Sequence, residues 1–209
     1  MCRAGRGRAL FVGRGGRRAV TGALAWEHGE ELNLVAIKIT VRGLDTATAQ
    51  VKAAVSEGIR NALNVAGARG EALVKEAIYT PYLGRPPAVA TGNLVNSITA
   101  SPVSQSPGIS RVEIIAAAPA DQYAGYVEAG TGPHFPPPSA LLLWVKKKFS
   151  VSTEKQALSI AFAVARKIAK RGVTAFGMFA RAFNKLEGEL GGIFEAQIAK
   201  ALRALGAAK

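Results

Sequence analysis

Residues 123–138, with the sequence YAGYVEAGTGPHFPPP, hold the densest group of side chains that could act chemically or bind a partner. Asp121 and Glu128 could form an acid–base pair of carboxylates, and Glu128 with His134 could form a hydrolase site. No third group in the sequence converges on either pair. We therefore interpret both carboxylates as solvated or salt-bridged, and Glu128 could pair with a basic side chain, including one of a neighbouring subunit.

Other catalytic or metal-binding chemistry finds little support in the sequence. His28 and His134 are the two histidines, and Cys2 is the single cysteine, so no group of ligands has the spacing of a zinc site. We expect His134 to be a loop residue bonded to the backbone. Phosphate-binding loops and nucleophile elbows are also missing. The sequence predicts a protein that is not an enzyme and that uses no cofactor and no metal.

The composition of residues 123–138 fits a contact surface better. Tyr123 and Tyr126 are three residues apart, so they share one face if the segment is helical. Tyrosine buries a large area while its hydroxyl stays polar, which suits the core of an interface. Pro133 and the prolines at 136–138 restrict the loop and reduce the entropy lost on docking. The alternative role for the two tyrosines is to close the core of their own domain.

The formal net charge of +13 admits two interpretations. Lysine and arginine concentrate in residues 1–18 and 146–171, without the interleaved aromatic residues of a single-strand platform. A solvated or partner-facing surface is favoured, and non-specific phosphate contact of a basic DNA-binding protein is the alternative. No segment has the roughly 18 apolar residues that a membrane span needs.

The elements that would position these residues follow from periodicity. Residues 1–34 have no persistent period and predict a disordered basic extension, and we hypothesise that the native chain starts near Val35. Residues 35–42 alternate as a half-buried strand. A turn at residues 43–45 leads to a helical region capped by Asp45 or Thr46. This region is either one long helix or two helices in tandem, with breaks at Gly67 and Gly70, and it ends before Pro81.

The second half of the chain predicts a hairpin and then helices. Residues 98–103 and 111–117 alternate as two antiparallel strands. Residues 139–149 and 153–171 are amphipathic helices, the second with a capping box, and a last helix starts near Thr174 with an interruption at Gly191 and Gly192. The fold class is α+β, with a small antiparallel sheet packed by a long N-terminal helix and C-terminal helices, in a single domain of residues 35–209.

Five segments in a fixed order resemble a known family. They are VAIKITVRGLD, TGNLVNSI, YAGYVEAGTGPHFPP, a helix with Trp144, and AFGMFARAF. Over about residues 35–205 this order resembles the gene-ten-product-like tail-component family of long-tailed bacteriophages. One departure is the stretch TAFG at residues 174–177, which lacks the proline often found there.

The resemblance implies a structural protein of the virion, encoded by a phage or prophage. Its members complete the tail or join it to the head, so we expect a ring-forming homo-oligomer. This ring would contact neighbouring neck and tail proteins, and it would contact the DNA passing through its channel non-specifically. The resemblance implies assembly in the host cytoplasm as well, and it implies no membrane partner. The resemblance also implies a turn entering the sheet at Thr91, Gly92, Leu94 and Ser97. The expected signature segment and interface comprise Tyr123, Tyr126, Glu128, Gly130, Thr131, Pro133, His134, Phe135, Pro136 and Trp144.

Overall fold

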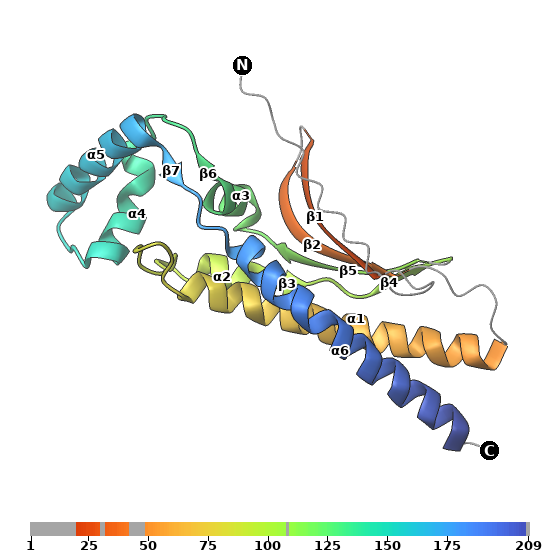
Figure 1. The fold of residues 1–209 in the computed structure, drawn as a ribbon. Helices are drawn as coiled ribbons and strands as arrows, with labels where there is room; N and C mark the ends of the chain where they lie inside the picture. Colours follow the sequence, from red (N-terminus) through yellow and green to blue (C-terminus); the bar gives the residue numbers. More distant parts are fainter. Residues whose placement is uncertain (1–19, 30–31, 42–48, 108, 208–209) are drawn as a thin grey trace.

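The computed structural model of the chain describes residues 20–29, 32–41, 49–107 and 109–207. The elements confirm the predicted α+β class, with a layered body at one end of which two helices project (Figure 1). In chain order they are β1 (Val20–Gly29), β2 (Leu32–Val41), α1 (Ala49–Tyr79), α2 (Asn93–Ser97), β3 (Ile98–Ala100), β4 (Ser104–Ser106), β5 (Ile109–Ala116), α3 (Asp121–Ala129), β6 (Gly130–Thr131), α4 (Pro138–Phe149), α5 (Glu154–Arg171), β7 (Val173–Thr174) and α6 (Met178–Ala207).

The larger sheet is antiparallel, with strand order β1-β2-β5-β3, and β4 also pairs with β5. The predicted strand over residues 98–103 is present only as β3, over Ile98–Ala100, and β4 lies in the stretch expected to connect the two strands. At the break, the Ser101 amide donates to the Glu113 carbonyl oxygen at 2.7 Å, and the Glu113 amide donates to the Ser101 hydroxyl oxygen at 3.0 Å. The serine side chain thus replaces one hydrogen bond of the strand pairing, and β5 pairs with β3 on one side of this break and with β4 on the other.

The first strand departs from the expectation that residues 1–34 have no regular structure. The backbone of β1 pairs antiparallel with β2, from Val20 opposite Val41 to Gly29 opposite Leu32. In the sequence, Leu24 and Trp26 alternate with small or charged residues, a strand pattern that the surrounding arginine and glycine obscure. Residues 1–19 and the turn and cap predicted at 43–46 lie outside the described residues. The division into domains and the start near Val35 stay predictions.

The long N-terminal helix is one continuous element. Gly67 and Gly70 do not break α1 but let it approach the sheet: a Cβ at Gly67 would lie 2.9 Å from Val112 Cγ2, and one at Gly70 would lie 2.8 Å from Ile114 Cδ1. Both distances are too short for a methyl group. A Cβ at Gly67 would press on the stiff Val112 side chain, and one at Gly70 would force the Ile114 side chain to shift, so both glycines allow α1 to pack close to the sheet.

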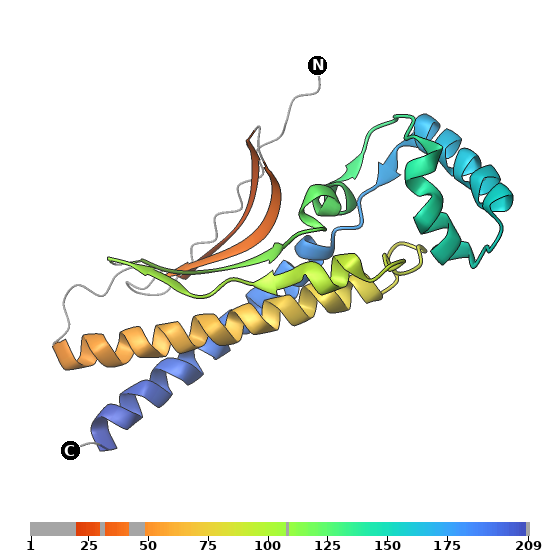
Figure 2. The same cartoon turned by 180° about the vertical axis from the view of Figure 1, so that it is seen from behind.

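The last helix, α6, runs beside α1, as two opposite views show (Figures 1 and 2). It begins at Met178 rather than near Thr174, because Val173–Thr174 pairs as strand β7 with β6. It also continues through Gly191 and Gly192, where an added Cβ would meet nothing within 4 Å. Its inner face packs with α1 and the sheet in one core whose largest fully buried side chains include Phe176, Phe179, Leu63, Leu73, Ile78, Ile114 and Leu186.

The predicted helices at 139–149 and 153–171 are present as α4 and α5. They form a hairpin with a small core of its own, in which Val145, Ala157 and Ala161 are buried. At the start of α5 the Thr153 hydroxyl donates to Gln156 Oε1 at 2.7 Å, whereas no side chain caps the backbone there. Among the described helices, none is long and apolar enough to cross a membrane.

Candidate functional site

The turn into the sheet lies at α2. Gly92 precedes the helix with φ of 82°, a conformation that glycine adopts readily, and the Asn93 amide donates to the Thr91 hydroxyl oxygen at 3.4 Å. Leu94 and Ser97 are buried in the body, and β3 begins directly after Ser97. These residues lead the chain into the sheet, and their side chains offer little surface to a partner.

The two tyrosines of the signature segment have different environments on α3. Tyr123 is half-buried and packs against the main core, and this burial raises the pKa of its hydroxyl. Tyr126 is 52 % exposed. The core role therefore applies to Tyr123, and Tyr126 is the tyrosine that remains accessible to another molecule.

Glu128 is buried at the end of α3, with 2 % of its surface exposed. Its Oε2 accepts a hydrogen bond from the Phe179 amide at 2.8 Å, and its Oε1 accepts one from the Ala180 amide at 3.0 Å. These are free amides in the first turn of α6, where the helix dipole favours a carboxylate. The expected solvated or salt-bridged glutamate is thus wrong here: Glu128 caps a distant helix through its backbone amides.

The pKa of Glu128 reflects the same surroundings. Burial raises it above the ordinary value, because the charged form loses its hydration. Hydrogen bonds from the amides of Phe179, Ala180 and Met178, and the charge of Arg181, act in the opposite direction without cancelling the effect of burial.

Two arginines complete this region. The Arg181 guanidinium lies 4.4 Å from the ring centre of Tyr82 and 4.7 Å from that of Phe176, and it donates to the Ala77 carbonyl oxygen at 2.6 Å. Arg85 donates to the carbonyl oxygens of residues 174 and 175 at 2.8 and 3.0 Å. We call the set formed by Tyr82, Arg85, Glu128, Phe176 and Arg181 the junction. It ties α1, α3, β7 and the start of α6 together.

A two-residue ribbon, β6 with β7, connects the junction to the projecting helices. Gly130 has φ of 73° and ψ of −175°, and a Cβ there would lie 2.3 Å from the Val173 carbonyl oxygen. Gly172 has φ of 67°, and a Cβ there would lie 2.0 Å from the Thr131 carbonyl oxygen. Only glycine fits at either position. Residues 132–172, which follow Gly130–Thr131 and precede Val173–Thr174, are called the arm below.

The arm begins with the proline loop. His134 Nδ1 donates to the Gly132 carbonyl oxygen at 3.0 Å, as expected for a loop histidine bonded to the backbone. Pro133 and His134 are exposed and Pro136 is half-buried. Phe135 is 54 % exposed, which is unusual for a phenylalanine in a restrained loop.

The helices of the arm also expose apolar side chains. Trp144 packs edge-to-face on Phe149, with ring centres 5.8 Å apart, yet both remain exposed. On the outside of the hairpin, Leu143, Leu158 and Phe162 are exposed as well. Six of the eleven exposed large hydrophobic residues of the described chain therefore lie in the arm.

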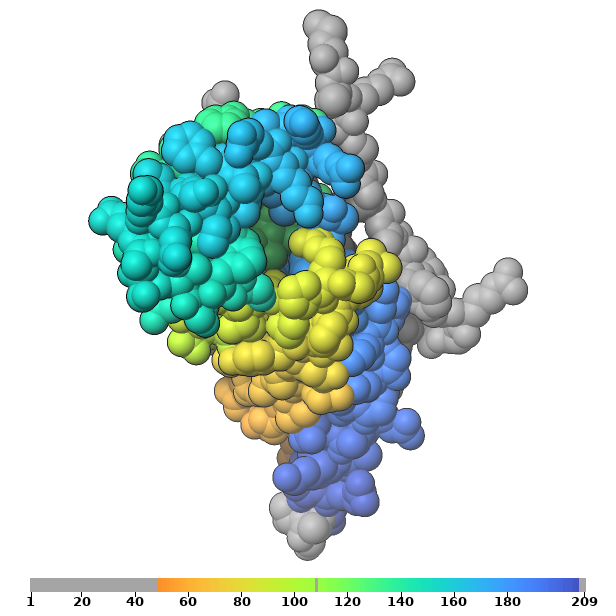
Figure 3. Space-filling view, turned by 90° about the vertical axis from the view of Figure 1, so that its left-hand side faces the viewer, coloured from red at the N-terminus to blue at the C-terminus, as the bar shows by residue number. Residues whose placement is uncertain are grey.

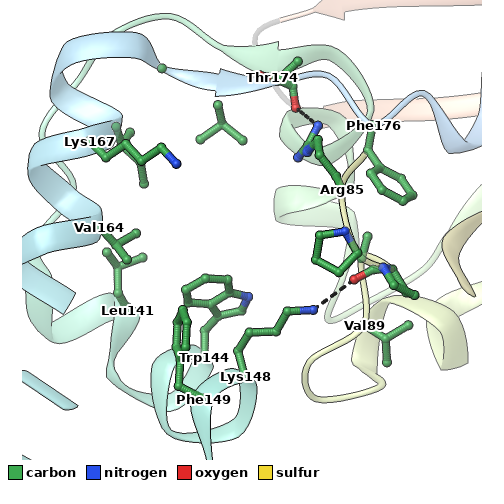
Figure 4. Close-up of a pocket in the computed structure, with 16 residues that line it drawn as sticks. Arg85, Val89, Leu141, Trp144, Lys148, Phe149, Val164, Lys167, Thr174 and Phe176 are labelled. Atoms are coloured by element: carbon green, nitrogen blue, oxygen red, sulfur yellow. Dashed lines mark hydrogen bonds between the residues drawn. The ribbon is translucent and has the colours of Figure 1, made fainter. Parts of the chain in front are cut away.

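A hollow of about 680 Å³ separates the arm from the body (Figure 3). Leu141, Trp144 and Val164 line it from the arm, and Arg85, Val89 and Phe176 line it from the body (Figure 4). One hydrogen bond crosses it, from Lys148 Nζ to the Pro87 carbonyl oxygen at 3.1 Å. Its walls are largely apolar, with cations at the rim.

The structure does not assemble a catalytic constellation from the sequence candidates. The oxygens of Glu128 accept amides of α6, whereas the ring of His134 is bonded to its own loop. Asp121 has a buried Oδ1 for which no hydrogen-bond partner is present. Within the described part of the chain, no group of three or more histidine, cysteine, aspartate or glutamate side chains could hold a metal ion.

Sequence reasoning missed several residues of the junction and the ribbon. Arg85 and Arg181 act through rings and carbonyl oxygens that lie far away in the chain, so no local pattern distinguishes them from other surface arginines. Gly172 did give a signal, since a glycine directly after a helix with two basic residues in its last turn is typical of a helix end.

Comparison with known proteins supports the resemblance over part of the chain. The family model described as "Bacteriophage HK97-gp10, putative tail-component" matches residues 43–130. The match extends from just before α1 to Gly130, so it includes α2, three strands, Glu128 and the first residue of β6, whereas β7, the arm and α6 lie outside it. No curated protein and no solved structure matched the chain. Residues 43–130 thus resemble the HK97-gp10-like phage tail components.

Proposed function

We propose that this protein is a ring-forming subunit of the neck or tail-completion region of a tailed phage, that it joins the tail to the head, and that it has no catalytic role. The matched family supports the broader class, a structural component of the phage tail. In this proposal the subunit contacts itself and neighbouring neck and tail proteins, assembles in the host cytoplasm and remains in the virion.

One observation supports the assembly role most directly: exposed apolar and aromatic side chains gather on one projecting part of the molecule. Phe135, Leu143 and Phe162 lie on the arm, and Tyr126 lies on α3, just before the ribbon in the chain; each is more than 40 % exposed. Aromatic residues are enriched in interface cores, and grouped exposure of this kind marks a surface that another molecule covers.

The arrangement also suits a ring. A closed ring needs heterologous contacts, in which one patch of each subunit meets a different patch of the next. The arm projects from the end of the body opposite the C-terminus of α6, so a contact through the arm is asymmetric (Figures 1 and 2). The junction and the glycine ribbon hold the base of the arm in one conformation, which reduces the entropy lost when it docks.

The test compares particles made without the gene, with the wild-type gene, and with the double variant Tyr126→Ala/Phe135→Ala, by electron microscopy. The proposal expects filled heads with unattached tails in the absence of the gene and a similar defect for the double variant. The matched control is Val65→Ala/Leu202→Ala, which removes exposed apolar groups from α1 and α6 and should give normal particles.

Other outcomes separate the alternatives. Aberrant tails would assign the protein to the tail itself rather than to the joint. Infectious particles of normal form without the gene would overturn the virion role and favour the basic DNA-binding protein. A double variant that assembles like wild type, in particles that do need the gene, would overturn only the proposed interface.

A further inference from the structure

The positive charge of the protein is concentrated in the arm. Residues 132–172 contain six lysines, two arginines and one glutamate, which is a net charge of +7 out of +13. The other residues described from position 49 onward contain ten lysines and arginines and nine acidic residues. The body is thus nearly neutral, and the arm is a distinct cationic unit.

The two regions also differ in how their charges are paired. In the body, Arg69 bonds Glu189 through Nε at 2.6 Å, Lys75 bonds Glu71 at 2.6 Å, and Lys185 bonds Glu76 at 2.7 Å. Among the ion pairs of the described residues, none includes a lysine or arginine of the arm. Because uncompensated cations this close together repel one another, binding of an anionic partner would reduce the electrostatic repulsion within the arm.

The cations are organised on one face of α5. Arg166, Lys167, Lys170 and Arg171 are exposed and surround Ala163 in an open groove of about 500 Å³. Their spacing repeats a pair of charges every four residues, or about 6 Å along the helix. The C-terminal dipole of α5 accounts for Lys170 and Arg171 in the last turn, but Arg166 and Lys167 lie a turn earlier.

Part of this face is turned away from the exposed phenylalanine of the same helix. Lys167 and Arg171 lie about 140° and 180° from Phe162 around an α-helix, whereas Lys170 lies about 80° and Arg166 about 40° from it. Lysine is depleted in protein–protein interfaces although arginine is enriched there, whereas lysine and arginine both contact the phosphate backbone of nucleic acid. The groove itself is lined by these four cations and Ala163, so it offers neither a carboxylate nor a large apolar group to a protein partner.

We infer that the α5 face formed by Arg166, Lys167, Lys170 and Arg171 binds the phosphate backbone of duplex DNA without sequence preference. Four phosphate contacts contribute about −3.6 to the slope of log affinity against log salt concentration. Between 50 and 200 mM salt that share of the affinity falls about 150-fold. This inference does not depend on ring formation or on a role at the head–tail joint.

The experiment measures binding of the full-length protein to a labelled duplex of arbitrary sequence by fluorescence anisotropy, across 50–200 mM salt. The double variant Arg166→Gln/Lys170→Gln should reduce the magnitude of the salt slope by about 1.8, and Lys167→Gln/Arg171→Gln should do the same. The control Lys200→Gln/Arg203→Gln removes the same charge from the exposed surface of α6 and should leave the slope unchanged. The arginines of residues 1–18 are present in every variant, so differences in slope report on α5.

Three results would overturn the inference: equal slopes in wild type and both α5 variants, an equal reduction in the α6 control, or no duplex binding by a protein that binds polyglutamate. The last result would assign the face to an acidic protein. A changed slope in a protein whose gene is dispensable for particles would uphold this inference and overturn the proposed function.

Discussion

The carboxylate of Glu128 holds the first turn of α6 against the end of α3, because both of its oxygens accept amides that the helix cannot pair internally. The backbone adds to this contact, since the amides of Phe176 and Gly177 donate to the carbonyl oxygens of Val127 and Glu128. The matched family segment ends two residues after Glu128, so this residue connects the matched segment to an unmatched helix. Its role in this structure is to position elements.

Removal of this carboxylate should destabilise the whole domain. Glu128→Ala leaves the Phe179 amide buried without a partner and weakens the start of α6, for which we expect a loss of about 2–3 kcal/mol in the free energy of unfolding. Glu195→Ala, an exposed glutamate on the same helix, should stay within about 0.5 kcal/mol of wild type. Urea unfolding followed by circular dichroism measures both. A Glu128→Ala protein as stable as the control would contradict the capping role.

The raised pKa of Glu128 gives a second prediction. Between the ordinary glutamate pKa of 4.5 and the higher folded value, the folded state holds a proton that the unfolded state has lost. The stability from this group is therefore fully present below about pH 4.5 and is lost as the pH rises through the folded pKa. Glu128→Gln cannot titrate, so the stability of wild type minus that of the variant should decrease from pH 4 to pH 8.

The same unfolding experiment contains its own control. Glu76 and Glu189 have lowered pKa values because of hydrogen bonds to Lys185 and Arg69, so their contributions are lost as the pH falls. Both are present in wild type and in Glu128→Gln, and they cancel in the difference. A difference that increases with pH would show that the amides outweigh burial at Glu128.

At the level of elements, the glycine ribbon determines where the arm leaves the body. Gly130 and Gly172 face the opposite strand so closely that each would drive a Cβ into a carbonyl oxygen. Gly130 lies opposite Thr174, whereas Gly172 contacts the backbone of Thr131 and Gly132, so a side chain at either position would push the strands apart. The direction of α4 and α5 depends on this contact more than on the single hydrogen bond from Lys148.

Gly130→Ala should therefore disturb the base of the arm. The positive φ costs about 1–3 kcal/mol for a residue with a Cβ, and the clash with Val173 adds to this cost. We expect faster limited proteolysis within residues 132–172 and lower overall stability. Gly132→Ala is the matched control, since a Cβ there meets nothing within 4 Å and its φ is not positive. Equal cleavage rates in the two variants would show that the ribbon does not fix the arm.

The elements show what the sequence could predict. Helical periodicity predicted α1, α4 and α5 almost to their ends, because each buries one face against its neighbour. It did not predict β6, β7 or β1. A two-residue ribbon has no period at all, and the ten residues of β1 lie in a composition that is typical of disorder. The interface hypothesis grouped Tyr123 with Tyr126 on one face. In the structure Tyr123 packs against the main core and Tyr126 is exposed, and only the tertiary fold determines this difference.

At the scale of the whole molecule, two cores of very different size are present. The main core joins α1, α6, α2, α3 and the sheet, whereas the core of the arm consists of Val145, Ala157 and Ala161 with a few half-buried neighbours. Among the described residues, the ion pairs lie in the body, and the lysines and arginines of the arm take part in none of them. A small core with net repulsion opens more easily than a large one, so the two parts should differ in local stability.

Native-state hydrogen exchange should resolve that difference. Val145→Ala removes two buried methyl groups from the arm core, and we expect it to lower the opening free energy of α4 and α5 amides by about 1–3 kcal/mol while amides of α1 keep their protection. Leu63→Ala in the main core should instead lower protection in both parts, because the arm has no support once the body unfolds. If Val145→Ala lowers the protection of α1 as much as that of α5, the arm and the body form one cooperative unit. Separate protection of the two parts would instead show that α4 and α5 open beyond a base that the junction and the ribbon still hold, as expected for a small core joined to a large one.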